Sequence, residues 1–223
     1  MCSRFALTSD PKTIKALCGY TTPAQFPPRE KIAPTEPIII VKEQTKGRVE
    51  AVLVRWGLIP HWVKDPDDFP LIINARAETL LEKPSFRTSL AHKRCLIPAD
   101  AFYEWSGPKS QRQRHTIKTQ TNTPFAFAGL WDHWLGADGS EFESAVIITV
   151  AANQDIAPLH DRMPAIINQQ DFGTWLDVRN VPAKEALKLL TPAPNGFFNS
   201  ESKAQNEGKH PAKKTSPKQG ELF

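Results

Sequence analysis

The stretch Ala145-Val146-Ile147-Ile148-Thr149-Val150 decides the fold, because an apolar, β-branched run of this length favours a strand buried on both faces. Further runs rich in β-branched and aromatic residues precede it along the chain. They lie at 38–41, 49–54, 94–97, 102–105, 115–118 and 125–130. Frequent strands with few helices between them favour an α+β domain dominated by antiparallel sheet over alternating βαβ units.

Helices are predicted to be short, because 20 prolines interrupt a chain of 223 residues. The best helical pattern covers 11–17, where Asp10 can cap the first turn and Pro11 stands at its first position. Two further helices are predicted at 171–178 and 182–190. From about 196 onward the sequence is polar, so we expect one domain over 1–195 and an extended or disordered tail over 196–223.

The composition excludes several classes of protein. Hydrophobic residues make up 40% of the chain and charged residues 23%, and no run approaches the roughly 18 apolar residues of a membrane span. The N-terminus lacks the apolar core of a secretory signal, which predicts a cytoplasmic protein. Cys2, Cys18 and Cys95 have no metal-ligand spacing and are expected to be free thiols. Neither a metal nor a cofactor is predicted, since a glycine-rich phosphate loop is also missing.

The net charge of +4 is unevenly distributed along the chain. Residues 83–118 carry 8 Lys and Arg against 2 Asp and Glu, whereas residues 119–200 carry 4 against 9. If the basic block folds onto one face, it can attract a polyanion such as a nucleic acid strand. A solvated hairpin with scattered charges is the equally weighted alternative.

Cys2 carries unusual chemistry if the initiator methionine is removed. The new N-terminus then holds an α-amine beside a β-thiol, and an amine with a pKa near 8 is roughly a tenth neutral at pH 7. Such an amine can attack an aldehyde to form a Schiff base. The neighbouring thiol can add to that imine and close a thiazolidine ring, which is more persistent than the imine itself.

Four further strings mix polar groups with apolar flanks. They are Trp56-Gly57-Leu58-Ile59-Pro60-His61-Trp62, Asn74-Ala75-Arg76-Ala77-Glu78-Thr79, Ala99-Asp100-Ala101-Phe102-Tyr103-Glu104-Trp105 and His160-Asp161-Arg162-Met163-Pro164. These strings follow Met1-Cys2-Ser3-Arg4 in this order. Because of these five ordered motifs, the sequence resembles the SOS-response-associated peptidase (SRAP) family, whose members are sensors that cross-link to abasic sites in single-stranded DNA. The resemblance extends to about Leu190 and implies a single SRAP-type α+β domain with a barrel-like antiparallel sheet and short helices.

The resemblance implies a catalytic group of four residues. Cys2 would form the thiazolidine with the ring-opened sugar, and Asn74 would orient its amine. Glu104 would shuttle protons. An apolar setting raises the pKa of a carboxyl group toward neutrality, where the group can both donate and accept a proton. His160 would handle a proton on the sugar or on the departing 3′ phosphate. An outward-facing strand position is the alternative for Glu104.

The resemblance also implies DNA contacts. Phosphates would bind to Arg4, Arg76 and Arg162, because a guanidinium group takes phosphate oxygens in pairs. Trp62 and Pro34 would form an apolar wedge against the bases, and Thr149 would place its hydroxyl at the site. A buried core position rivals the wedge role of Trp62 and is the better reading for Trp56.

The sequence departs from the family pattern at three positions. Ser3 stands where glycine is usual, Lys31 where asparagine is common, and Ala101 where glycine is common; none of these removes a catalytic group. The resemblance implies that the partner is single-stranded DNA with abasic sites. We expect the protein to be a monomer that binds this DNA at the nucleoid, alongside replication or repair proteins. Two alternatives stay open: a cysteine peptidase that uses Cys2, His160 and Asn74, and a non-catalytic DNA-binding module.

Overall fold

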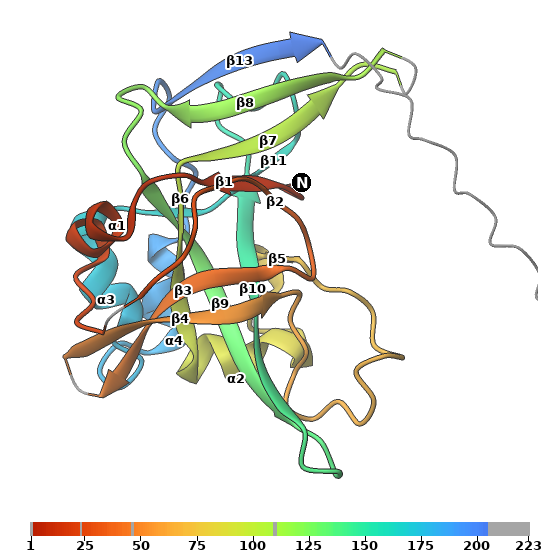
Figure 1. Ribbon diagram of the computed structural model, residues 1–223, viewed down its shortest axis with the longest axis vertical. Helices are drawn as coiled ribbons and strands as arrows, with labels where there is room; N and C mark the ends of the chain where they lie inside the picture. Colours follow the sequence, from red (N-terminus) through yellow and green to blue (C-terminus); the bar gives the residue numbers. More distant parts are fainter. Residues whose placement is uncertain (1, 23, 46, 109–110, 205–223) are drawn as a thin grey trace, which may run out of the picture.

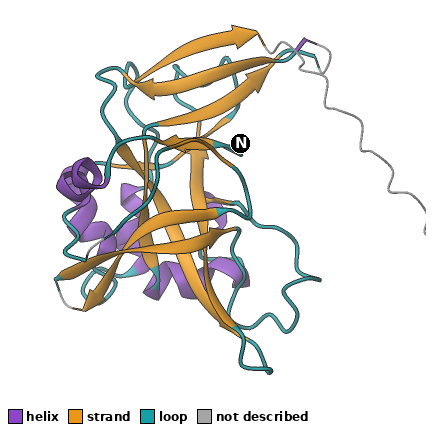
Figure 2. Cartoon of the chain, viewed as in Figure 1, coloured by secondary structure: helices purple, strands orange, loops and turns teal. Residues whose placement is uncertain are grey.

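The computed structural model describes residues 2–22, 24–45, 47–108 and 111–204. Within this part of the chain, β-strands dominate and the helices are short (Figure 2). The strands are β1 (Phe5–Leu7), β2 (Arg29–Ile32), β3 (Pro37–Thr45), β4 (Arg48–Trp56), β5 (Asn74–Arg76), β6 (Arg94–Ala99), β7 (Ala101–Ser106), β8 (Gln113–Thr119), β9 (Phe125–Leu135), β10 (Glu141–Ala151), β11 (Arg162–Pro164), β12 (Ile166–Ile167) and β13 (Phe198–Ala204). The helices are α1 (Pro11–Cys18), α2 (Pro84–His92), α3 (Phe172–Leu176) and α4 (Ala183–Ala186), with 3₁₀ turns η1 (Ala77–Thr79), η3 (Gln169–Asp171) and η4 (Leu187–Leu189).

Five strands close into a barrel. Around the circuit β10 pairs with β4, β4 with β3, β3 with β6, β6 with β9, and β9 again with β10. All of these pairs are antiparallel except the parallel pair of β10 and β4. The α+β class with an antiparallel, barrel-like sheet is thereby confirmed. The run 145–150 lies in β10 and is buried throughout. β10 also pairs with the short strands β5 and β11.

A second sheet lies above the barrel in Figure 1, in the order β13-β8-β7-β1-β2. Aromatic side chains join the two sheets: the ring of Phe5 in β1 lies 5.2 Å from Trp56 and 5.7 Å from Phe127. Phe102 of β7 contacts Phe127 as well, with ring centroids 6.2 Å apart. The core therefore runs without interruption from the barrel into the second sheet, and Trp56 is fully buried in it, as predicted.

The predicted helix at 11–17 is confirmed as α1, which begins at Pro11 and runs one residue longer. The Asp10 side chain accepts hydrogen bonds from the backbone N–H groups of Lys12 and Thr13, and Gly19 ends the helix with a φ of 71°, a conformation that glycine adopts without strain. The other two predicted helices are shorter than expected. The chain over 169–176 divides into η3 and α3, and 183–189 divides into α4 and η4.

Two cations of the basic block 83–118 are engaged inside the protein. Arg94 is 1% exposed, and its guanidinium donates to the carbonyls of Leu90, Trp175, Asp177 and Val181. Lys93 forms an ion pair with the buried Asp132. Charge counted along the sequence therefore overstates the charge that is available to a polyanion.

β13 lies beyond the predicted domain boundary at 195 and pairs with β8 along its whole length. The rest of the predicted tail, 205–223, lies outside the described residues. Among the residues that are described, no helix is long and apolar enough to cross a membrane.

Candidate active site around Cys2

Cys2 is fully buried just before β1. Its Sγ lies 3.6 Å from the backbone oxygen of Arg4, and the Asn74 side chain donates a hydrogen bond of 2.8 Å to the Cys2 carbonyl. Burial raises the pKa of the Cys2 thiol far above its usual range, and the negative charge of Glu104 raises it further. At neutral pH the sulfur is therefore a protonated thiol, as are the buried thiols of Cys18 and Cys95, and all three cysteines are free.

Glu104 lies in β7 with its side chain inside the protein, 4% exposed, so the outward-facing alternative is wrong. Burial raises the pKa of its carboxyl group, while electrostatic interaction with His160 lowers it in part. Glu104 acts electrostatically on Cys2, and His160 acts electrostatically on Glu104, so Glu104 lies within electrostatic range of both side chains. A carboxyl group with a raised pKa can serve as both acid and base near neutral pH.

His160 stands at the end of the loop that follows β10. Its Nδ1 lies 2.6 Å from Asp161 Oδ1 and 2.9 Å from the backbone nitrogen of Arg162. The backbone N–H of Arg162 donates to Nδ1, so Nδ1 is the acceptor and Nε2 carries the proton of the neutral ring.

Arg162 opens β11, and a carboxylate holds its guanidinium group. Nη1 and Nη2 donate to the two carboxylate oxygens of Glu78 at 2.7 and 2.9 Å, and Nη2 also donates to the Thr149 carbonyl at 2.6 Å. Thr149 is buried, with Oγ1 3.4 Å from the carbonyl oxygen of Ala75. Glu78 lies in the string 74–79, but no role is predicted for it, because nothing in the sequence pairs its carboxylate with Arg162.

Strand pairing explains how distant segments meet here. β5 lies parallel to β10 with Asn74 opposite Ile147 and Arg76 opposite Thr149, and β11 lies on β10 with Arg162 opposite Ala151. β1 lies between β2 and β7 in the second sheet, so Cys2 comes close to Glu104. The sequence-predicted residues Cys2, Asn74, Glu104, His160, Thr149 and Arg162 are thereby gathered where the two sheets meet.

The other predicted DNA-binding residues lie outside this group. Arg76 is exposed, and Arg4 is half-buried with its guanidinium on the Ser3 carbonyl. Trp62 is 49% exposed and packs edge-on against Phe69 at 5.8 Å, so the core alternative for Trp62 is wrong. Pro34 lies on the loop between β2 and β3. Within the described ranges, no cluster of His, Cys, Asp or Glu is arranged to hold a metal ion.

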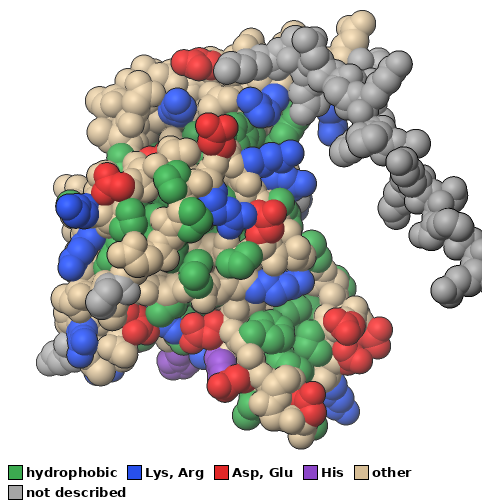
Figure 3. Space-filling view, in the orientation of Figure 1, with side chains coloured by type: hydrophobic (Ala, Val, Ile, Leu, Met, Phe, Trp, Pro, Cys, Tyr) green, Lys and Arg blue, Asp and Glu red, His purple; other side chains and the backbone are tan. Residues whose placement is uncertain are grey.

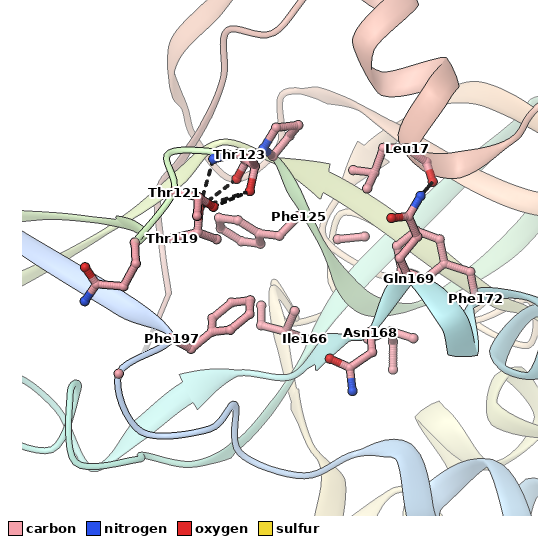
Figure 4. Close-up of a pocket in the computed structure, with 15 residues that line it drawn as sticks. Leu17, Thr119, Thr121, Thr123, Phe125, Ile166, Asn168, Gln169, Phe172 and Phe197 are labelled. Atoms are coloured by element: carbon pink, nitrogen blue, oxygen red, sulfur yellow. Dashed lines mark hydrogen bonds between the residues drawn. The ribbon is translucent and has the colours of Figure 1, made fainter.

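A hollow of about 370 Å³ opens elsewhere, between the β8–β9 loop, β12 and the end of α1 (Figure 4). Phe125, Ile166 and Phe197 line it together with threonines of the loop, and Gln169 at its rim donates to the Leu17 carbonyl. None of the ten predicted site residues lines this hollow. The predicted chemistry-bearing side chains therefore lie apart from this hollow.

Comparisons with known proteins identify the family of this chain. The family model described as SOS response associated peptidase (SRAP) matches residues 1–204. The abasic site processing protein YoqW of Bacillus subtilis is 38% identical over 198 residues, which cover 86% of this chain and 87% of that protein. The chain belongs to the SRAP family.

Other SRAP relatives extend the comparison. The abasic site processing protein HMCES of Xenopus tropicalis is 29% identical over an alignment of 254 positions, which covers 94% of this chain and 76% of that protein. A crystal structure of a protein from Bacteroides thetaiotaomicron superposes with a TM-score of 0.82 at 26% identity, covering 90% of this chain and 91% of the other. The SRAP match reaches the end of β13, beyond the boundary expected at 195.

Proposed function

We propose that this SRAP protein captures abasic sites in single-stranded DNA by forming a thiazolidine through the α-amine and thiol of Cys2, after Met1 has been removed. One observation carries the proposal. Cys2 is held through its carbonyl by Asn74 and lies beside Glu104, a buried carboxyl group with a raised pKa. The curated relatives are named abasic site processing proteins, which supports the choice of aldehyde.

The reaction requires an acid–base group that works in both directions. The neutral amine attacks the sugar aldehyde, and the adduct loses its hydroxyl group as water to leave an iminium ion. The sulfur then adds its electron pair to the iminium carbon, while the C=N π electrons return to nitrogen and the thiol proton leaves. Overall one water is released, and Glu104 can give the proton to the departing hydroxyl and take the proton from sulfur.

The protonated state of the Cys2 thiol fits this order of events. Because its pKa is raised, the sulfur does not compete with the amine for the aldehyde, and it becomes a nucleophile only when a base accepts its proton. Asn74 Oδ1 is buried without a hydrogen-bond partner among the described residues, so it can accept from the α-amine. His160, whose Nε2 carries the proton of the neutral ring, would supply the proton that opens the sugar ring.

The strand itself would be held by the predicted DNA contacts. Arg4, Arg76 and Arg162 would bind phosphates, with Thr149 hydrogen-bonded nearby. The exposed ring of Trp62, together with Pro34, would pack against the bases as an apolar wedge. A covalent cap of this kind shields the lesion from strand cleavage and places the protein with replication or repair machinery at the nucleoid.

The peptidase alternative is less well supported. A cysteine nucleophile that cleaves peptides is a thiolate with a lowered pKa, whereas the pKa of Cys2 is raised. In our proposal the peptidase activity of the family name is restricted to processing of the protein's own N-terminus, and the chemistry on DNA is lyase-like Schiff-base chemistry.

The test mixes the protein with a single-stranded oligonucleotide that bears one abasic site. We expect an adduct that resists denaturants, with a mass equal to that of both components less one water. Cys2→Ala is expected to give no thiazolidine, and a tetrahydrofuran analogue without an aldehyde is expected to bind without an adduct. Absence of an adduct with the unmutated protein would refute the proposal.

An extension before Cys2 separates the alternatives. A non-removable residue on the α-amine should abolish the adduct while leaving binding of the oligonucleotide intact. A non-catalytic DNA-binding module would give no adduct in either form. A thiol peptidase would tolerate the extension and would cleave a peptide substrate in both forms.

A further inference from the structure

Beside Arg4, which the proposed function already assigns to a DNA phosphate, the outer face of the second sheet carries aromatic and basic side chains that have no role in that function. Arg4 of the segment before β1, Lys31 of β2, Tyr103 and Trp105 of β7, and Arg114 of β8 surround one shallow hollow. We call these five residues the aromatic–basic patch. Figure 3 shows Lys and Arg side chains gathered on this side of the molecule, beside the N-terminal end of the chain.

The alternation of β7 separates this patch from the acid–base group. Successive strand residues point to opposite faces, so Glu104 lies inside while Tyr103 and Trp105 lie on the other face. Trp105 lies directly opposite Arg114 in the pairing of β7 with β8. The two rings of the patch lie 6.5 Å apart at an angle of 54°.

The basic members have little to neutralise them. Arg114 lies over the Tyr103 ring, 5.2 Å from its centroid, and its buried Nε has no hydrogen-bond partner in the described part of the chain. Arg4 donates to a backbone carbonyl, and no ion pair of Arg4, Lys31 or Arg114 is found among the described residues. The nearest acidic residue along β2 is Glu30, whose backbone carbonyl accepts from the Tyr103 hydroxyl at 2.6 Å.

The chemistry of the patch matches an unpaired nucleotide. Aromatic rings interleaved with cations bind single-stranded nucleic acids, because bases stack on the rings and phosphates meet the charges. The hollow has a volume of only about 20 Å³, which is too small to enclose a base. A nucleotide bound here would therefore lie across the patch, with its base against the half-buried Trp105 ring and a phosphate near Arg114 and Lys31.

The patch lies close to the reacting residue. Arg4 is two residues from Cys2, a separation of about 7 Å in an extended chain. The backbone N–H of Tyr103 donates to the Arg4 carbonyl at 3.0 Å, which fixes β7 against this segment. We propose that the aromatic–basic patch is a subsite for a nucleotide next to the abasic site, with Trp105 as the stacking platform and Arg114 and Lys31 as phosphate ligands. This inference rests on the proposed function, because it takes single-stranded DNA as the ligand.

The experiment uses undamaged oligonucleotides, so its result does not depend on covalent chemistry. Affinity for a fluorescent single strand is measured as a function of salt concentration for the parent protein, Trp105→Ala, Trp105→Phe and Arg114→Ala. The matched control is Arg179→Ala, an exposed arginine on the turn after α3. A duplex of the same sequence tests whether an unpaired base is required.

We expect Trp105→Ala to weaken single-strand binding about 5- to 10-fold, the lower part of the range for one stacked base, because the ring is only half exposed. Trp105→Phe should retain most of the affinity, which excludes general loss of structure as the cause. Arg114→Ala should lower the slope of log K against log salt by about 0.7, the value for one phosphate of a single strand. Arg179→Ala should match the parent, and duplex binding should be insensitive to Trp105→Ala.

Unchanged affinity in both Trp105→Ala and Arg114→Ala would overturn the subsite. An equal loss with Arg179→Ala would also overturn it, since it would indicate only a general effect of positive charge. If the subsite fails while the unmutated protein still forms its adduct with abasic DNA, the proposed function stands. If the adduct fails while these variants lose affinity as expected, the subsite stands without the capture chemistry.

Discussion

Replacing Glu104 with glutamine removes a buried acid–base group while keeping the shape of the side chain. Loss of general acid–base catalysis costs about 10²- to 10⁴-fold in rate. Glu104 is 4% exposed, so solvent water replaces it poorly, and we expect a loss near 10³-fold. This corresponds to an increase of about 4 kcal/mol in the activation free energy.

The assay is the rate of denaturant-resistant adduct formation under single-turnover conditions, with affinity for the tetrahydrofuran oligonucleotide measured in parallel. Affinity for that oligonucleotide should change little, because Glu104 faces the site of reaction. An adduct rate within threefold of the parent would refute the acid–base role. A rate loss that is matched by an equal loss of affinity would also refute it.

The same variant makes a prediction for stability. Because burial raises the pKa of Glu104 in the folded protein, the folded state keeps this proton to a higher pH than the unfolded chain does. The contribution of Glu104 to stability is therefore complete below its unfolded pKa and is lost as the pH rises through its folded pKa. Glu104→Gln should be at least as stable as the parent at pH 8 and should lose that advantage at pH 4, as measured by urea unfolding. Lower stability than the parent at pH 8 would contradict the raised pKa.

Three further predictions concern groups around the site and in the core. Glu78→Gln should cost less than about 1 kcal/mol in stability, because the carboxylate is half exposed, yet it should slow adduct formation, because the Arg162 guanidinium loses the carboxylate that orients it. The hydrogen bond from Arg162 lowers the pKa of Glu78, so the ion pair stabilises the fold at any pH above the ordinary carboxyl pKa. This stabilisation is lost as the pH falls through the lowered pKa of Glu78. The stability of the variant should therefore fall less steeply with acidification than the stability of the parent does. Arg94→Met should cost at least about 3 kcal/mol in urea unfolding, because four carbonyls lose their donor, and a loss under 1 kcal/mol would contradict that role. Iodoacetamide should modify the native cysteines at least 10-fold more slowly than the urea-unfolded chain, because all three are buried with raised pKa values; equal rates would contradict their burial.

The strands of the barrel were predictable because their signals are local. The runs 38–41, 49–54, 94–97, 125–130 and 145–150 each lie inside an observed strand. All of them are rich in β-branched or aromatic residues, and all but 49–54, in which only Ala51 and Val54 are buried, are buried throughout. The closed circuit was not predictable from any of them, since it depends on pairings such as Val41 with Leu96, which are set by packing over the whole domain.

The elements that were missed lack such a local signal. Helix α2 begins at Pro84 with no side-chain cap at Lys83 and carries serine and threonine in its middle, so its helical pattern is weak. β13 reads as a polar tail in the sequence, and it is a strand because β8 offers it an edge for hydrogen bonding. Its buried anchor, Phe198, contacts Phe102 and Phe125, which are more than 70 residues away in the sequence.

The site was predictable as a set of residues but not as a geometry. The ordered strings around Cys2, Asn74, Glu104 and His160 identified the side chains that the fold gathers. The carboxylate of Glu78 on Arg162, 84 residues away, could not be read from them, because nothing in a linear string says which charges pair.

The alternation of β7 makes this strand intolerant of any change in length. Insertion or deletion of one residue between Ala101 and Ser106 would exchange its two faces, moving the Glu104 carboxyl group to the solvent and the rings of its neighbours into the core. Point substitutions can remove acid–base chemistry and base stacking one at a time, but a shift in register would remove both together. Natural variation in this strand should therefore consist of substitutions, with length changes confined to the β7–β8 turn.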